Sequence, residues 1–460
     1  MSRLGVLALI FLCFFAVFAY AQENVAANTD EGKTKEGKAE EDSKGKSAAR
    51  QGSGFNFAAI VGAANMSHTS GTNTTYTQFI LSPELDLGFF GIGFAFNLEF
   101  DQDGSLRPGE WDSWQAIVSK VSYLRLGNKG EDFYLQIGSL KKATLGHGTI
   151  VDRFDNTLYM PDVRLMGVQL DIDFGAVGFE TFMANLLRPD TSVAAGRLFV
   201  RPFSGLFKSL QVGATFAADF DPGAIVRSGE DKYKFEKSGT APAIHILGAD
   251  FGLPLPSLGI LTWLLYADFT TILDAGQGFA AGLMGDVAFI FNWKFEFTRN
   301  SKNYISSYFD SLYLVNRATK FDDMAMNITD SYSGWLFRIW QDFSFVGKND
   351  LTVSLQIRDS FGDEIKPMLS FDLLIDRSLL FNRVEINLNY TKNNITSFGN
   401  VFKIEGLDTF VTLSVGYMIA ENVMIALVYQ KTFVLENPGD PTDHTLKGQE
   451  TMMVQTQFKF

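Results

Sequence analysis

Histidines and paired acidic residues build most catalytic and metal sites, and this chain offers few in a recognisable pattern. Its four histidines are His68, His147, His245 and His444, and none belongs to an HExxH or other close metal pair. The chain has neither a Gly-x-Ser-x-Gly nucleophile motif nor a phosphate-binding Walker loop. We therefore expect no enzyme, no catalytic residue and no cofactor.

The chain also lacks a pattern of cysteines or a complete calcium-binding loop that could form a site. The single cysteine, Cys13, lies in an apolar N-terminal run, so the rest of the chain has no thiol nucleophile, disulfide or cysteine ligand. The stretch Asp-Gln-Asp-Gly-Ser at 101–105 resembles the start of a calcium loop, but the twelfth position, which needs a bidentate glutamate, is Asp112. We interpret the stretch as a solvated external loop and expect no metal site.

Charged residues that share a face with alternating polar positions are more informative. They are Arg197, Arg201, Arg338, Arg358 and Arg383, with Glu99, Asp171, Asp173, Glu180, Asp219, Asp268, Asp286, Asp342, Asp372 and Glu385. On the lipid face of a membrane barrel an Arg or Lys costs about 2–4 kcal/mol at the midplane, so these groups would line the lumen. Charges of both signs predict a hydrated passage. The excess of acids, ten against five arginines, predicts that this passage weakly prefers cations. The alternative is that these charged residues pair across the wall and support a plugged interior.

The elements that would hold these side chains are β-strands, because hydrophobicity alternates with a period of two. Large apolar residues occupy every second position over 92–100, and the pattern recurs over 166–174, 210–220 and 384–390. Each segment thus has one apolar face and one polar or small face. The apolar face would meet a shared core in a soluble sandwich, but lipid in a transmembrane barrel.

Connection lengths distinguish these two folds. About 20 segments of roughly ten residues follow one another, near the length that crosses a bilayer at a tilt. Short turns, such as 88–90 and 175–176, alternate with long loops, such as 139–162 and 300–333. Outer-membrane barrels sort their connections in this way, whereas a sandwich has no reason to do so. We predict an all-β chain forming a single antiparallel transmembrane β-barrel of 18 to 20 strands.

The C-terminal segment supports the same fold. Met452, Val454, Thr456, Phe458 and Phe460 share one face of a final strand that ends in phenylalanine. This ending resembles the assembly signal of outer-membrane β-barrel proteins of diderm bacteria, and residues 55–460 resemble a porin-like member of that class. The resemblance implies an outer-membrane location, with membrane lipid and the barrel-assembly machinery as partners. General porins often form trimers, so a homo-oligomer is an open alternative.

The resemblance also suggests a constriction. In trimeric porins the third external loop folds into the lumen, and residues 139–162 hold that position here. The charged residues of this loop are Lys141, Lys142, His147, Asp152, Arg153 and Asp155. Residues 300–333 mix aromatic and acidic side chains, which suits either a lid or a surface that binds partners.

The chain divides into three predicted regions. Residues 1–21 have a basic start, an uncharged apolar run and a final Ala-Tyr-Ala, which together indicate a signal peptide; a retained membrane helix is the alternative. Residues 22–54 hold seven acidic and six basic side chains and no aromatic residue, which predicts a disordered periplasmic arm. Residues 55–460 form the barrel.

These features together predict an outer-membrane porin or channel through which small hydrophilic solutes or ions diffuse. A net charge of −13 excludes a nucleic-acid partner, since phosphate binding needs a concentrated basic surface. The 44 phenylalanines suggest a different function, a transporter of hydrophobic molecules of the fatty-acid-transporter type. The charged residues 22–54 count against the N-terminal hatch usual in that family. The sequence is also compatible with a loop-based adhesin or surface structural protein, and with a soluble β-sandwich.

Overall fold

The structure is a computed structural model of the 460-residue chain. It describes residues 54–67, 73–100, 103–105, 117–160, 164–203, 210–226, 235–236, 242–288, 290–326, 328–346, 350–362, 365–404, 406–435 and 446–459. The predicted signal peptide and nearly all of the charged arm therefore lie outside the described residues. The chain divides into two compact units, and residues 48–396 and 403–460 form the one that holds the strands. In the other unit, residues 398–401 form the short helix α4 (Phe398–Val401).

The strand-bearing unit is built almost entirely of β-strands. They are β1 (Gly54–Ser67), β2 (Asn73–Asp86), β3 (Phe90–Phe94), β4 (Phe96–Phe100), β5 (Val121–Gly127), β6 (Phe133–Gly138), β7 (Gly167–Asp173), β8 (Val177–Met183), β9 (Val193–Val200), β10 (Gln211–Asp219), β11 (Ile225–Val226), β12 (Phe235–Glu236), β13 (Ile244–Leu258), β14 (Leu261–Ile272), β15 (Gln277–Val287), β16 (Phe291–Asn300), β17 (Tyr332–Phe343), β18 (Leu351–Ser360), β19 (Met368–Ile375), β20 (Val384–Lys392), β21 (Thr409–Ala420), β22 (Val423–Leu435) and β23 (Leu446–Lys459). Helix α3 (Tyr313–Met326) and the 3-10 turns η2 (Pro189–Thr191) and η4 (Arg377–Leu379) lie in connections. Among the described residues, no helix is both long and apolar enough to cross a bilayer.

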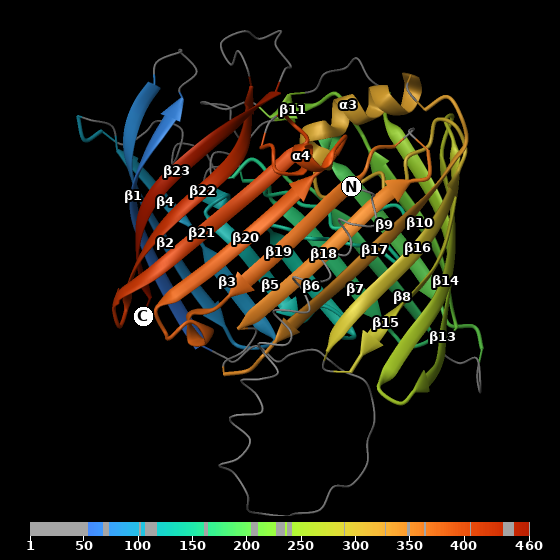
Figure 1. Ribbon diagram of the computed structural model, residues 1–460, viewed down its shortest axis with the longest axis horizontal. Helices are drawn as coiled ribbons and strands as arrows, with labels where there is room; N and C mark the ends of the chain where they lie inside the picture. Colours follow the sequence, from blue (N-terminus) through green and yellow to red (C-terminus); the bar gives the residue numbers. More distant parts are fainter. Residues whose placement is uncertain are drawn as a thin grey trace, which may run out of the picture. The chain divides into compact units, whose positions relative to one another are not determined.

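All of these strands except β11 and β12, which pair with each other, form one antiparallel sheet in which chain neighbours pair side by side (Figure 1). β3 and β4 are two halves of one strand interrupted at Ala95, because both pair with β2. β1 pairs with β23 at Ala58–Gly62, so the sheet returns to its first strand. Its 21 elements, two of which are these halves, therefore make a ring of 20 strands. The predicted all-β antiparallel barrel is confirmed, at the upper end of the predicted strand number.

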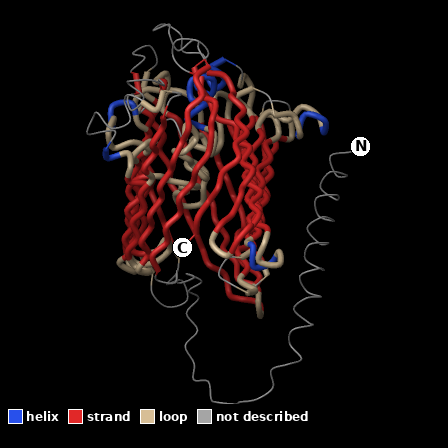
Figure 2. The backbone as a smooth tube through the Cα atoms, turned by 90° about the vertical axis from the view of Figure 1, so that its left-hand side faces the viewer, coloured by secondary structure: helices blue, strands red, loops and turns tan. Residues whose placement is uncertain are grey.

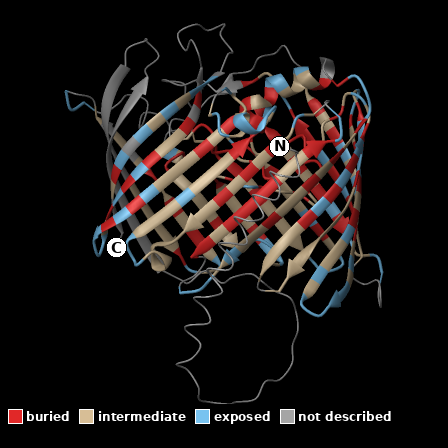
Figure 3. Ribbon diagram, in the orientation of Figure 1, coloured by how far each residue is buried: buried red, intermediate tan, exposed pale blue. Residues whose placement is uncertain are grey.

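The faces of this sheet are inverted relative to a soluble protein. On β16, Lys294 and Glu296 are 5% and 2% exposed, whereas Phe295 and Phe297 are 48% and 42% exposed. The alternation along the strands is visible in Figure 3. Other exposed apolar residues on strands are Leu198, Val212, Phe216, Leu247, Leu265, Phe269, Phe279, Val415, Ile425, Leu427 and Val454. A contiguous apolar outer surface of this kind is normal for a protein in lipid and unusual for one in water.

The connections are sorted by length between the two ends of the barrel. Connections at one end include 87–89, 174–176, 259–260, 288–290 and 421–422. The long connections 101–120, 139–166, 220–243, 301–331 and 393–408 all leave from the other end. The short connection 273–276, also at that other end, is an exception to the alternation. The polar inner faces and two of the long connections together build the interior of the barrel.

Candidate constriction of the lumen

The connection between β6 and β7 folds into the barrel. Its described residues 139–160, here called the first inward loop, bury Leu140, Val151, Phe154 and Leu158 to 1% exposure or less. Figure 2 shows loop segments enclosed by the strands. The predicted constriction loop thus occupies the lumen, although its effect on passage stays a prediction.

A second connection, residues 301–331 with helix α3, packs against the first and is called the second inward loop. The two loop segments run side by side. The Asp152 amide donates to the Phe309 carbonyl at 3.0 Å, and the Phe309 amide donates to the Ile150 carbonyl at 3.0 Å. The Ser307 amide continues this ladder by donating to Thr149 at 2.8 Å. The two loops therefore form one body held by backbone hydrogen bonds.

The two inward loops and the inner wall share a hydrophobic core. Its buried residues include Leu140, Ile150, Val151, Phe154 and Leu158 of the first loop, Tyr304, Tyr308, Phe309 and Tyr313 of the second, and Phe182, Ala217, Ile246 and Ile272 of the wall. At Gly248 of β13 a Cβ atom would lie 2.6 Å from Ile150 Cδ1, so glycine permits this close approach. A barrel of this size has a lumen wider than wall side chains can fill, and here the loops occupy it.

At one side of the first inward loop, cations of the loop and of the wall gather around two carboxylates. The arginine cluster, as we call it, consists of Lys142, Arg153, Arg338 and Arg358 around the carboxylates of Asp152 and Asp372. Arg153 Nη2 lies 2.6 Å from Asp372 Oδ2, and Lys142 Nζ lies 2.9 Å from the same atom. Four cations thus share two carboxylates, which leaves an excess of positive charge.

Asp152 is the centre of this cluster. Its carboxylate accepts a hydrogen bond from Gln356 Nε2 at 3.0 Å and lies 3.5 Å from Arg358 Nη2 and 3.8 Å from Arg338 Nη1. Burial alone would raise the pKa of Asp152, but the surrounding cations, Arg338 foremost, outweigh burial and hold that pKa below its usual value. Arg153 Nε is buried and makes no hydrogen bond among the described residues.

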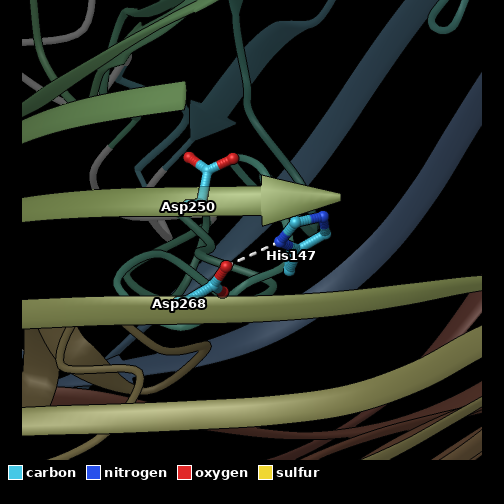
Figure 4. Close-up of side chains that lie close together, drawn as sticks. All are labelled: His147, Asp250 and Asp268. Carbon is cyan, nitrogen blue, oxygen red and sulfur yellow. Dashed lines mark hydrogen bonds and ion pairs between the residues drawn. The ribbon is translucent and has the colours of Figure 1, made fainter. Parts of the chain in front are cut away.

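The other side of the first inward loop meets β13 and β14 through His147 (Figure 4). His147 Nδ1 lies 2.7 Å from Asp268 Oδ1, and Thr149 Oγ1 donates to Asp268 Oδ2 at 2.8 Å. The His147 ring stacks on Tyr266 with 4.4 Å between centroids. Asp250, next to Asp268 in the strand register, completes a group whose possible ligand atoms lie within 4.8 Å of one another. We call His147, Asp250 and Asp268 the histidine cluster.

Arg197 on β9 supports this region from the neighbouring wall. Its Nε and Nη2 bind the two oxygens of Asp250 at 2.8 and 2.6 Å, and its Nη1 lies 3.3 Å from Glu180. Glu180 also accepts the Gly146 amide at 2.9 Å. Glu180 thus connects the ion pair on the wall to the backbone of the first inward loop.

Several other predicted lumen residues are also paired. Arg201 binds Asp173 at 2.7 Å, and Lys129 lies 3.4 Å from Asp171. Asp219, with no exposed surface, pairs with Arg317 of α3. The predicted alternative of pairing across the wall therefore describes much of this charge, and its plugged interior stays a prediction.

Other predicted residues lie outside these networks. Asp286 accepts from the Thr262 hydroxyl and the exposed Asp342 from Thr352. Glu385 is half-buried on β20, and the side chain of Glu99 is not among those described. Lys141 is exposed on the first inward loop, and Asp155 binds Thr157 beside it at 2.7 Å.

The prediction that Arg383 faces the lumen, made from the period-two pattern, is wrong. Arg383 lies exposed in the turn before β20, where strand parity no longer sets the direction of a side chain, and Nη1 donates to the Tyr417 hydroxyl at 3.0 Å. Tyr417 is exposed and pairs with Val384. For the predicted assembly signal, Phe458 pairs with Val423 and Ala59, while Phe460 lies outside the described residues.

Sequence reasoning missed several residues of the interior. Asp250 has the same parity as Gly248 and Ile246, and Lys294 alternates with phenylalanines, so the period-two pattern contained both. Arg317 could not be found in this way, because it lies on a helix within a connection. Its role depends on contact with Asp219, 98 residues away in the chain.

Comparisons with known proteins gave matches among solved structures only. No protein-family model matches the chain, and no curated protein matches it. Among solved structures, OpdK of Pseudomonas aeruginosa with vanillate is 9% identical over 88% of this chain and 98% of its own, at a TM-score of 0.32. OprB of Pseudomonas putida is 10% identical over 89% and 94%, at 0.29, and a BenF-like porin of Pseudomonas fluorescens Pf-5 is 7% identical over 88% and 98%, at 0.32. The chain resembles porins.

Proposed function

We propose that the protein is an outer-membrane channel through which small hydrophilic solutes or ions diffuse along a passage narrowed by the two inward loops. The observation that carries this proposal is the inversion of the barrel, with exposed Phe295 and Phe297 alternating with buried Lys294 and Glu296. A surface of this kind fits lipid outside and polar solute inside.

Passage in this proposal involves no chemical step. A concentration gradient drives the flux, the inward loops set the width, and charged side chains beside them set which solutes enter. The arginine cluster lies where one side of the first inward loop contacts the wall, and the histidine cluster lies where its other side does. A solute that passes the loop therefore meets fixed charges of both signs.

Weak cation preference is the finer part of the proposal. Among the described residues, Asp286 and Asp342 have inward parity and bind only threonine hydroxyls. Many of the other acids are neutralised by the ion pairs described above. The cation preference then comes from a small remainder of acids, and the arginine cluster opposes it.

Single-channel recording tests the proposal directly. The protein refolded without residues 1–21 in a planar bilayer is expected to give stepwise, long-lived openings, with a reversal potential in a salt gradient that indicates mild cation preference. Folded, heat-modifiable protein without conductance would contradict the channel. In that case hydrophobic-ligand binding would be measured to test a transporter, and the effect of trimming the external loops to test an adhesin.

Neutralising the arginine cluster is expected to strengthen cation preference. Arg338→Gln and Arg358→Gln remove two cations that share Asp152, so the reversal potential should move further in the cation direction. Arg299→Gln is the matched control, because Arg299 is exposed and has outward parity. An unchanged reversal potential would show that ions do not pass close to the cluster.

The shared core of the inward loops raises a second candidate, a lumen closed until the loops move. Phe154, Phe309 and Tyr313 are completely buried in that core, which is typical of a fixed plug. Conductance that appears only after loop movement, for example above a threshold voltage, would favour this candidate over an open porin.

A further inference from the structure

We propose that the histidine cluster is a binding site for one divalent transition-metal cation, best suited to Zn²⁺, which fastens the first inward loop to the barrel wall. His147 comes from the loop, and Asp250 and Asp268 come from the adjacent strands β13 and β14 (Figure 4). An imidazole nitrogen and carboxylate oxygens are ligands that Zn²⁺ accepts.

A cavity lies at the cluster. It has a volume of about 10 Å³ and is lined by the three cluster residues and by Thr149, Thr215 and Thr270, among others. That volume is near the room that one water molecule needs. A single ion or water molecule therefore fits.

The local charges favour a cation in that space. Arg197 lies between the carboxylates of Glu180 and Asp250, and in the described part of the chain Asp268 has no lysine or arginine in an ion pair. Lys294 approaches the His147 carbonyl at 2.6 Å but is matched by Glu296 at 2.9 Å. Three carboxylates against one arginine leave two negative charges. A protonated His147 would offset one of them, and a divalent cation would offset both.

The bonds already present leave ligand capacity. Arg197 binds both oxygens of Asp250, but a carboxylate has about four lone-pair positions and can accept from both sides. The Asp268 oxygen that does not face His147 accepts from Thr149. Hydrogen bonds of this kind orient ligands in known metal sites. The Nδ1–Oδ1 separation of 2.7 Å in the metal-free arrangement is a hydrogen bond, whose proton the metal would replace.

A metal here would act on the mobility of the loop. His147 lies between Gly146 and Gly148, both of which have positive φ, so the side chain is held on a tight turn. One cation bound to both loop and wall would remove the freedom of that turn to move away from β13 and β14. In the channel proposed above, this site would fasten the first inward loop to the wall of the lumen. Its test needs no measurement of flux.

The test is Zn²⁺ binding to the refolded protein, made without a histidine tag and freed of metal with a chelator. Calorimetry should show one saturable site, and zinc X-ray absorption should show an imidazole ligand. His147→Asn and Asp268→Asn should each weaken binding at least on the order of 100-fold, because outer-shell partners alone are worth about 10–100-fold. His245→Asn is the control, because His245 lies on β13 with opposite parity to Asp250 and stacks on exposed Phe216.

Three outcomes overturn the proposal. They are absence of saturable binding to the unmutated protein, an absorption spectrum without imidazole, and binding that survives in both His147→Asn and Asp268→Asn. Heat-modifiable migration establishes that each variant is folded. Because the first two measurements use the unmutated chain, a variant that fails to fold does not protect the proposal.

Discussion

Replacing Arg317 by methionine is expected to destabilise the barrel interior by about 3–5 kcal/mol, because it leaves Asp219 buried and uncompensated. Asp219 has no exposed surface, and Arg317 Nε donates to it at 3.0 Å. Tyr313 Oη also donates to Asp219, at 2.7 Å, and Arg317 Nη2 donates to the Thr191 carbonyl at 3.1 Å. Burial lowers the pKa of Arg317, but Asp219 more than offsets burial and raises that pKa, so the guanidinium stays charged.

The measurement is denaturant unfolding of the refolded protein, followed by tryptophan fluorescence. The double variant Asp219→Leu with Arg317→Met should recover much of the lost stability, since an apolar pair of similar volume can replace a buried ion pair. Arg299→Met removes an exposed arginine and is the control. Equal effects of Arg317→Met and Arg299→Met would show that α3 is not held by this pair.

Replacing residues 141–158 by a short Gly-Ser linker is expected to raise single-channel conductance several-fold. These residues carry the buried side chains Val151, Phe154 and Leu158 and both charged contacts to the wall. Without them the ring of strands would enclose a much wider aqueous lumen. The measurement is conductance in a planar bilayer at fixed salt.

The control for this replacement adds the same linker without removing the loop. An insertion after Asp274 suits this purpose, because Asp274 is exposed in the short connection 273–276. That variant should conduct like the unmodified protein. Unchanged conductance after removal of 141–158 would place the passage elsewhere in the barrel.

The wall of the barrel was predictable because each strand carries its own signal. Lys294 and Phe295 alternate within a single segment, so the sequence alone indicates which side chain faces outward. The alternation of short and long connections is equally local. Parity fails beyond a strand's end, as at Arg383, where the turn sets the direction of the side chain.

The contents of the lumen were much less predictable. The first inward loop was expected from its position in the chain, but its partners Asp268 and Asp372 lie more than 100 residues away. The pairing of Phe309 with Ile150 follows no period and has no motif. Such contacts depend on which long loops fit together within the ring, and this is a property of the whole fold.

The register at the ends of the chain has a consequence for how the ring closes. β1 pairs with β2 along its whole length, Gly54–Ser67, but with β23 only at Ala58–Gly62. β22 and β23 are joined along Val423–Leu435. Each terminal hairpin is therefore paired over many more residues within itself than with the other hairpin. Since hydrogen bonds between neighbouring strands hold the sheet together, the two ends of the chain are joined through a short run of backbone pairing.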